Sequence, residues 1–127
     1  MGKPSDPGSE LPQAVEWYGF PLATFEGILR VAWGRRWGLE EYCGITVRGE
    51  KMLVGAFGQR FFALLPGCEK EFKVTQRLSS LADALRAFRI AGLKPGSIAF
   101  APIRDGRLTA VQLRGGWLRA YIAPVVE

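Results

Sequence analysis

The sequence predicts an α+β fold: a small, strongly bent antiparallel or mixed β-barrel with one clear helix and short N-terminal helices. Three observations lead to this prediction. Residues 81–91 carry apolar side chains at helical spacing. Short β-rich segments alternate with turn residues on either side of them, and glycines recur among the earlier segments, as in the tight corners of a small barrel. The 127 residues are expected to form one domain over 11–127, after a disordered tail over 1–10.

The first elements are predicted to be short helices. In LPQAVEWYGF, Pro12 suits the first position of a helix and Gly19 its stop, so a helix is expected over about 12–18. PLATFEG repeats the pattern on a smaller scale, because Pro21 can start a single turn of helix that ends at Gly27.

Residues 28–65 are predicted to form a meander of short strands. ILRVAW is rich in β-forming residues, and GRR can turn the chain back into WGLEEY. CGITVRGEKMLVGAF is typical of a hairpin with Gly49-Glu50 at its turn, and FGQRFFALL makes a further return. The glycines that suit bulges and corners in this region are those at positions 34, 38, 44, 49, 55 and 58.

The clearest element is a helix predicted over 81–91. Ser80 can cap its first turn, with Asp83 as the capping-box partner three residues later. Gly92 stands where a helix commonly ends, and Pro95 prevents the helix from continuing. The apolar face that is expected to pack against the strands carries Leu81, Leu85 and Phe88, with Ala84 and Ala91 beside them.

The C-terminal third is predicted to be a three-stranded antiparallel meander. Its strands are SIAFAPI, LTAVQL and WLRAYIAP, joined by RDGR and RGG. Asp105-Gly106 is the strongest short-range hairpin signal in the chain, and Gly115-Gly116 is a second one. Alternation along the last strand assigns to the core Leu118, Ala120 and Ile122.

The opposite face of this last strand has an unusual composition. Trp117, Arg119 and Tyr121 alternate on it as an aromatic–arginine–aromatic series. If exposed, they would stack on bases and contact a phosphate; if the helix covers them, they belong to the core and Arg119 reaches out to solvent. The neighbouring basic side chains favour the first alternative: Arg104, Arg107 and Arg114.

A second combination of aromatic and basic side chains follows the first predicted strand. Trp33 and Trp37 flank the basic turn of Arg35 and Arg36. RNA-binding proteins use arginines for phosphates and aromatic rings for bases, whereas tryptophans at strand ends also cover small cores. Trp17 and Trp33 are assigned to the core, and Trp37 is left open between the two roles.

The net charge of +5 lies entirely in residues 65–127, because the residues before them carry equal numbers of basic and acidic side chains. Between Lys73 and Arg119 the acidic side chains are only Asp83 and Asp105. A basic half suits a polyanionic partner such as nucleic acid, although small proteins also carry such a charge for solubility alone.

Residue types on which many enzymes and metal sites rely are scarce. The chain has no histidine, and it contains no phosphate-binding loop, dinucleotide fingerprint or nucleophile elbow. Cys43 and Cys68 lie far apart and form no metal motif. They are expected to be buried thiols, and a disulfide between them stays open as the alternative. No catalytic residue, metal or cofactor is therefore predicted. Without a long apolar run or a signal-peptide pattern, the expected location is the cytoplasm.

Two short motifs resemble a known family. WYGFPLATFEG looks like the opening of a domain attached to Sun-type RNA cytosine-5 methyltransferases and found in stand-alone archaeal proteins. AGLKPGSI resembles that domain's Gly-aliphatic-basic-x-Gly turn, with Lys94 at the basic position. The resemblance covers most of residues 12–123 and implies a PUA-like fold that binds structured RNA. The chain is too short to hold a methyltransferase domain and lacks that family's catalytic Pro-Cys, so methyl transfer is not implied.

The sequence as a whole predicts non-catalytic binding of structured RNA, such as tRNA or rRNA. An RNA-modifying enzyme or a ribosomal component is the expected protein partner, and no membrane is. Two alternatives stay open: a protein-interaction module whose aromatic surface meets another chain, and a small enzyme acting on a nucleotide. The predicted RNA-binding residues are Arg35, Arg36, Trp37, Lys94, Arg104, Arg107, Arg114, Trp117, Arg119 and Tyr121.

Overall fold

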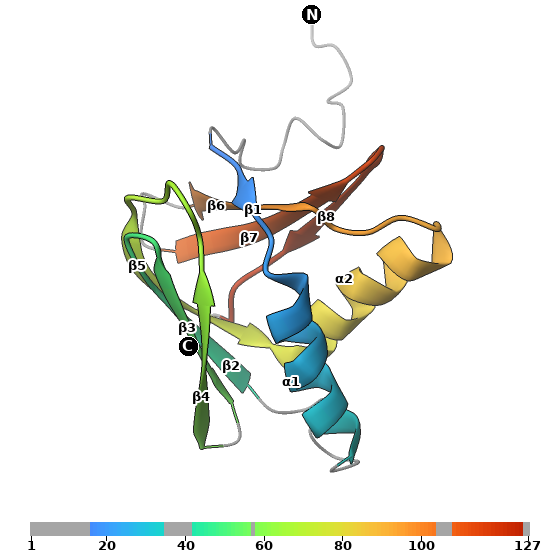
Figure 1. The fold of residues 1–127 in the computed structure, drawn as a ribbon, viewed down its shortest axis with the longest axis horizontal. Helices are drawn as coiled ribbons and strands as arrows, with labels where there is room; N and C mark the ends of the chain where they lie inside the picture. The colour runs from blue at the N-terminus through green and yellow to red at the C-terminus, as the bar shows by residue number, and fades with distance from the viewer. Residues whose placement is uncertain (1–15, 35–41, 57, 104–107, 126–127) are drawn as a thin grey trace, which may run out of the picture.

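The computed structural model describes residues 16–34, 42–56, 58–103 and 108–125. Within these residues the chain is an α+β protein with two helices and two four-stranded antiparallel sheets (Figure 1). The predicted α+β class is confirmed. The predicted N-terminal tail lies outside the described residues.

The first sheet has the strand order β4-β3-β2-β5. The predicted hairpin with Gly49-Glu50 at its turn joins β2 to β3, and the predicted return joins β3 to β4, so both predictions are confirmed. Strand β5 has no counterpart among the predicted elements, because its charged first residues have the composition of a surface turn. The bounds are Tyr42–Arg48 for β2, Lys51–Ala56 for β3, Gln59–Leu64 for β4 and Glu71–Arg77 for β5.

The segment ILRVAW is helical, and the strand predicted there is wrong. Helix α1 spans Leu22–Gly34. Phe25, Ile28 and Leu29 are buried on one face of it at helical spacing, so packing of this face overrides the β preference of the branched residues. Gly27, which was expected to end a single helical turn, lies exposed in the middle of α1.

The helix predicted over about 12–18 is wrong at its C-terminal end, and its earlier part lies outside the described residues. Strand β1 spans Tyr18–Gly19 and pairs with the start of β6, and the two residues before it are not helical. The ring of Tyr18 lies 6.4 Å from that of Phe100 on β6, measured between centroids. This contact with a strand far along the chain holds the segment extended.

Helix α2 spans Leu78–Ile90 and confirms the helix predicted over 81–91, although it begins earlier. Its N-cap residue is Arg77 rather than Ser80, and no side chain caps the first turn. The extended backbone of Arg77 is the end of β5, so the strand runs directly into the helix. The residues that α2 buries are Leu78, Leu81, Ala84, Leu85 and Phe88.

The C-terminal end of α2 has the predicted glycine cap. Gly92 adopts a φ of 73°. Its N–H donates to the carbonyl of Arg89, and the N–H of Leu93 donates to the carbonyl of Phe88 at 2.9 Å. These two bonds form a Schellman motif, in which a left-handed residue turns the chain out of the helix. None of the helices in the described part of the chain is long and apolar enough to cross a membrane.

The second sheet has the strand order β1-β6-β7-β8 and contains the predicted C-terminal meander. The hairpin predicted at Gly115-Gly116 joins β7 to β8, with its turn one position later at Gly116 and Trp117 because Gly115 pairs with Leu118. Asp105-Gly106 lies outside the described residues. The bounds are Ser97–Ile103 for β6, Leu108–Gly115 for β7 and Leu118–Ile122 for β8. The β8 side chains predicted to face the core are buried or packed against it: Leu118, Ala120 and Ile122.

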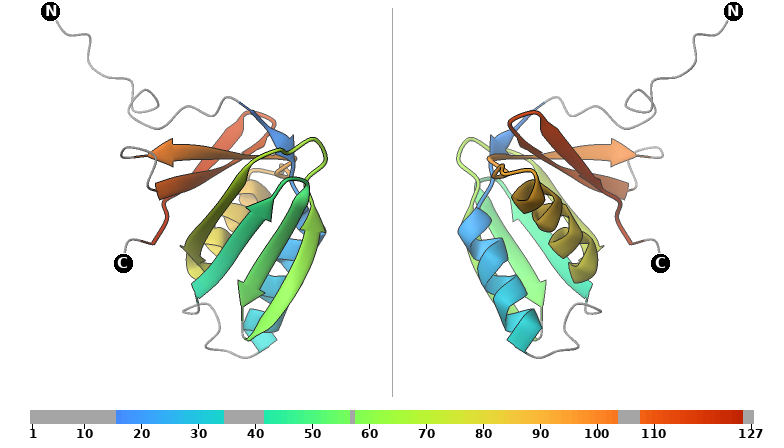
Figure 2. Two further views of the ribbon diagram at one scale, coloured as in Figure 1. Left: turned by 90° about the vertical axis from the view of Figure 1, so that its left-hand side faces the viewer. Right: turned by 90° about the vertical axis from the view of Figure 1, so that its right-hand side faces the viewer.

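Both helices cover the same face of the first sheet. In Figure 2 they lie behind this sheet in one view and in front of it in the other. The second sheet crosses one end of this arrangement (Figure 1). Aromatic rings join the two sheets, since the centroids of Phe72 on β5 and Phe100 on β6 are 4.6 Å apart. No described element covers the opposite face of the first sheet.

Neither sheet closes into a barrel or curls strongly, so the predicted barrel is wrong. Each sheet has an open strand order. Gly44 and Gly55, which were expected to suit bulges or corners, face each other within the regular ladder between β2 and β3. In addition, residues 28–33, which were predicted to form the first strand of the barrel, belong to helix α1.

The β7–β8 hairpin packs against the end of α2 at Gly115. A Cβ atom on Gly115 would lie 2.1 Å from the carbonyl oxygen of Lys94 and 3.0 Å from the ring of Phe88. Nearby, the N–H of Gly96 donates to the carbonyl of Arg114 at 2.9 Å. The hairpin therefore approaches the chain after α2 at a distance that only glycine permits.

The Gly115→Ala variant is expected to lose about 3 kcal/mol of unfolding free energy, because backbone must move to admit the methyl group. Urea denaturation measures the loss. Gly96→Ala is the matched control: Gly96 lies in the segment after α2 that Gly115 packs against, its added Cβ meets nothing within 4 Å, and its expected change is within about 0.5 kcal/mol. Equal stability of the two variants would show that the loop moves freely.

The Gln76→Met variant is expected to be more stable than the wild type. Gln76 is fully buried on the inner face of the first sheet, and neither amide atom has a hydrogen-bond partner among the described residues. An unpaired buried amide costs about 1–3 kcal/mol, and methionine fills similar space without it. Urea denaturation should show a gain of about 1–2 kcal/mol. A loss would mean that a buried water bonds the amide.

Candidate nucleic-acid interface

The face of the first sheet that points away from the helices, which we call the open face, is organised in rows. Because side chains alternate along each strand, residues paired across neighbouring strands lie side by side on the same face. From β4 to β5, the rows are Arg60–Gly55–Gly44–Thr75, Phe62–Leu53–Thr46–Lys73 and Leu64–Lys51–Arg48–Glu71.

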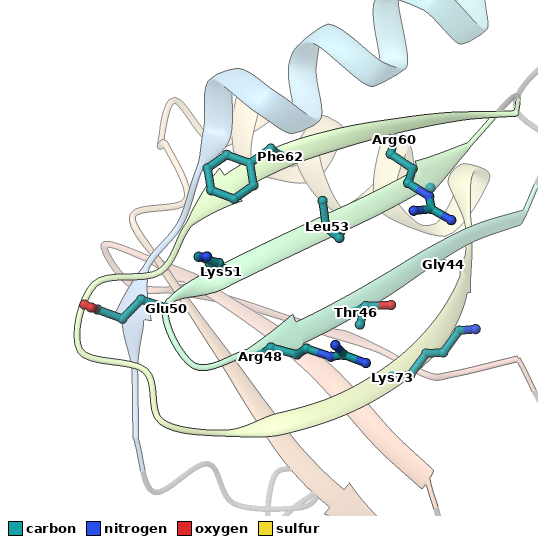
Figure 3. A pocket seen from close by; sticks show the side chains of 10 residues that line it. Gly44, Thr46, Arg48, Glu50, Lys51, Leu53, Arg60, Phe62 and Lys73 are labelled. Carbon is teal, nitrogen blue, oxygen red and sulfur yellow. The ribbon is translucent and has the colours of Figure 1, made fainter.

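The middle of the open face is hollowed, with a volume of about 1030 Å³ (Figure 3). Gly44 and Gly55 contribute bare backbone to its floor. An added Cβ on Gly44 would meet nothing within 4 Å, and one on Gly55 would meet only carbonyl oxygens at 3.9 Å. Close packing therefore does not require either glycine, although a glycine inside a strand costs about 0.5–1 kcal/mol. Such glycines are found where a ligand approaches the backbone closely.

Cationic side chains surround the hollow. Lys51, Arg60 and Lys73 line it and are exposed, and none of them forms an ion pair with another described residue. Figure 3 shows that they extend from three different strands. Their charges are therefore available to an anionic ligand.

The carboxylates of this face have partners within the protein. Glu71 lies 3.9 Å from the Nε of Arg48, with both side chains 78% exposed, so this pair contributes little stability. Glu50 accepts a hydrogen bond from the backbone N–H of Gly67 at 2.7 Å. The balance of charge on the open face is positive.

Exposed apolar and aromatic side chains lie among these charges. Phe62 is 55% exposed, and Leu53 beside it is also exposed. Tyr42 is exposed at the end of β2, with the guanidinium carbon of Arg77 at 5.7 Å from its ring centroid. A ring that can stack and a cation that can pair with phosphate therefore occur together, as single-stranded nucleic acid requires.

The predicted residues Lys94 and Trp117 lie near each other at another place. Lys94 is exposed after α2, and its carbonyl oxygen faces Gly115 at the β7–β8 turn. Trp117 belongs to this turn, just before β8, and is 77% exposed. Its exposure agrees with the predicted stacking role, which stays a prediction.

Arg114 and Arg119 are cross-strand partners, and both guanidinium groups lie over the ring of Trp17. Their guanidinium carbons lie 4.2 Å and 5.5 Å from the ring centroid of Trp17. Trp17, which was expected in the core, is half-buried under these two arginines. Arg119 is exposed and Arg114 is half-buried, so their predicted contacts with RNA stay predictions.

The face of the second sheet that carries Arg119 is not an open platform like that of the first sheet. Ala99, Ala110 and Gln112 of this face are buried. Tyr121 is half-buried and lines a hollow between β8 and α2. The predicted site residues outside the described residues are Arg35, Arg36, Trp37, Arg104 and Arg107.

The open face was not among the sites that the sequence predicts. A signal was present: in KMLVGA, Met52 and Val54 alternate with Lys51, Leu53 and Gly55, as expected for a strand with one buried face. Only strand order shows that the outward residues of β2, β3, β4 and β5 form one surface.

The described residues contain no cluster of three or more side chains able to hold a metal ion. Cys43 and Cys68 are free and buried, which confirms the predicted buried thiols. Burial raises the pKa of the Cys43 thiol to about 12. Burial and the hydrogen bond to Glu16 also raise the pKa of the Tyr18 phenol.

Comparisons of the chain with protein-family models, curated proteins and solved structures find no match.

Both cysteines are expected to resist a disulfide reagent such as Ellman's reagent in the folded protein and to react on unfolding in urea. The thiolate is the reactive form of cysteine. Because burial raises the pKa of Cys43 to about 12, its thiol stays protonated at neutral pH. In the unfolded chain this thiol ionises near pH 8.5. Between that pH and about 12 only the unfolded state loses the proton, so the free energy of unfolding falls as the pH rises. Rapid labelling of the native protein at neutral pH would contradict the buried placement.

Proposed function

We propose that the chain is a non-catalytic RNA-binding domain and that the open face of the first sheet contacts the RNA. The observation that carries the proposal is a hollow with apolar and aromatic walls, surrounded by cations that form no ion pair with another described residue. Lys51, Arg60 and Lys73 would neutralise phosphates, and Phe62 would stack on a base.

The chemistry of this face favours binding over catalysis. The residues that line the hollow include no thiol or imidazole, and both cysteines of the chain are buried elsewhere. Glu50 is the one carboxylate among the lining residues and accepts a hydrogen bond from a backbone amide, while Glu71 beside the hollow faces Arg48. A general acid and base pair is therefore missing from the lining residues.

The sequence resemblance to the PUA-like domain of RNA methyltransferases implies the same class of ligand, with tRNA or rRNA as the structured RNA, although the described strands do not form the barrel that it also implies. The proposal does not depend on that resemblance, because the charge and aromatic content of the open face support RNA independently. An RNA-modifying enzyme or a ribosomal component is the protein partner that the proposal implies.

A second candidate function is a protein-interaction module. Trp117 and Ile90 favour it, since both are 77% exposed on the described surface. An apolar interface with another protein would depend weakly on salt, whereas RNA binding falls steeply with salt. The salt dependence of complex formation therefore separates the two candidates.

The double variant Arg60→Gln, Lys73→Gln is expected to bind RNA roughly tenfold more weakly, with a salt dependence shallower by about 0.7 per lost phosphate contact. Fluorescence anisotropy with labelled tRNA over a range of salt concentrations measures both quantities. The control Arg86→Gln, Arg89→Gln removes the same charge from exposed positions on α2 and should bind like the wild type. Equal losses in both double variants would mean that net charge alone attracts RNA.

A further inference from the structure

We propose that the bare floor at Gly44 and Gly55, one part of the hollow in the open face, seats one unpaired nucleobase, so that the ligand is a single-stranded segment of RNA such as a loop. This inference rests on the proposed function and goes beyond it, because cations alone would also bind duplex RNA. It is carried by the form of the hollow, the exposed ring at its wall and the cations at its rim.

The size of the bare floor suits a single base. Gly44 and Gly55 are adjacent across neighbouring strands, which are about 4.8 Å apart, and the next side chains on this face are about 7 Å away along each strand. The backbone is therefore bare over an area of roughly one planar ring system. A ring seated there would contact peptide groups on its lower face.

The wall beside this floor supplies stacking and hydrogen bonding. Phe62 and Leu53 lie in the next row and are exposed, so a base would cover apolar surface that is otherwise in water. Thr46 lies beside Leu53 in the same row and brings a hydroxyl group that can donate and accept hydrogen bonds. The site therefore offers both a stacking partner and an edge contact.

The cations at the rim fit the strand that carries the base. Arg60 is the cross-strand partner of Gly55, and Lys73 is the cross-strand partner of Thr46. They lie on β4 and β5, the two outer strands of this sheet. The phosphates on either side of a seated base would meet the positive charges of Arg60 and Lys73. The RNA strand would then cross the sheet from one edge to the other.

A duplex cannot use this arrangement. Its bases are stacked inside the helix, and the protein reaches mainly phosphates and ribose hydroxyls. The apolar wall of Phe62 and Leu53 would then remain uncovered. An unpaired base can enter the hollow without first breaking a base pair.

Two variants test the seat. Gly55→Val fills the floor at a position where an added Cβ meets only carbonyl oxygens at 3.9 Å, and valine favours strands, so the melting temperature should rise while affinity for a short oligoadenylate falls. Phe62→Ala removes the wall at an exposed position and should lower affinity roughly 5- to 150-fold, the value of one stacked base. Both variants should keep the salt dependence of the wild type, because the cations are unchanged.

The controls separate this inference from the proposed function. Gly27→Ala, at an exposed position of α1, should also raise the melting temperature but leave affinity unchanged.

The wild type is titrated with the oligoadenylate, with the same oligomer lacking its bases, and with an adenine–uracil duplex. Tighter binding of the intact single strand, lost in both variants, supports the seat. Equal affinity for all three probes, or wild-type affinity in either variant, overturns it while RNA binding stands. Failure to bind any probe overturns the proposed function itself.

Discussion

Burial of only one face of the first sheet is the constraint on which the rest of the structure depends. Both helices pack on the inner face, and the second sheet closes the end of the same core (Figure 2). An antiparallel sheet tolerates this arrangement, because its alternating side chains can be apolar inward and polar outward. The outward residues are not packed against another element. They can therefore include charged side chains, exposed aromatic rings and glycines, which would be unfavourable together in a core.

The two sheets hold together through contacts between segments far apart in the chain. Phe100 on β6 of the second sheet packs against Phe72 on β5 of the first. At the other end of the second sheet, Gly115 lies against the carbonyl of Lys94, just after α2. These contacts fix the second sheet to the helical layer and leave the open face of the first sheet uncovered. The fold and the candidate site therefore follow from the same packing.

The distribution of charge along the chain does not predict the charged surface. Residues 65–127 hold the net positive charge, and the predicted RNA-binding residues are drawn largely from them. The open face instead combines Arg60 and Lys51 from the balanced part of the chain with Lys73 from the basic part. Strand pairing selects one face of each strand, so a surface can be basic although residues 1–64, which supply three of its four strands, have no net charge. The arginines of β7 and β8 meanwhile lie against Trp17.

The sequence by itself determined the elements whose causes are local. The α2 helix, its glycine stop at Gly92 and the hairpins at Gly49-Glu50 and Gly115-Gly116 depend on spacing and turn chemistry within a few residues. Only the tertiary structure decided that ILRVAW is helical, that β5 joins β2 and that the sheets stay open. These outcomes depend on which apolar faces meet, because burial against distant segments outweighs local preference. The candidate site belongs to this second group, since four strands must align before its floor, wall and rim exist.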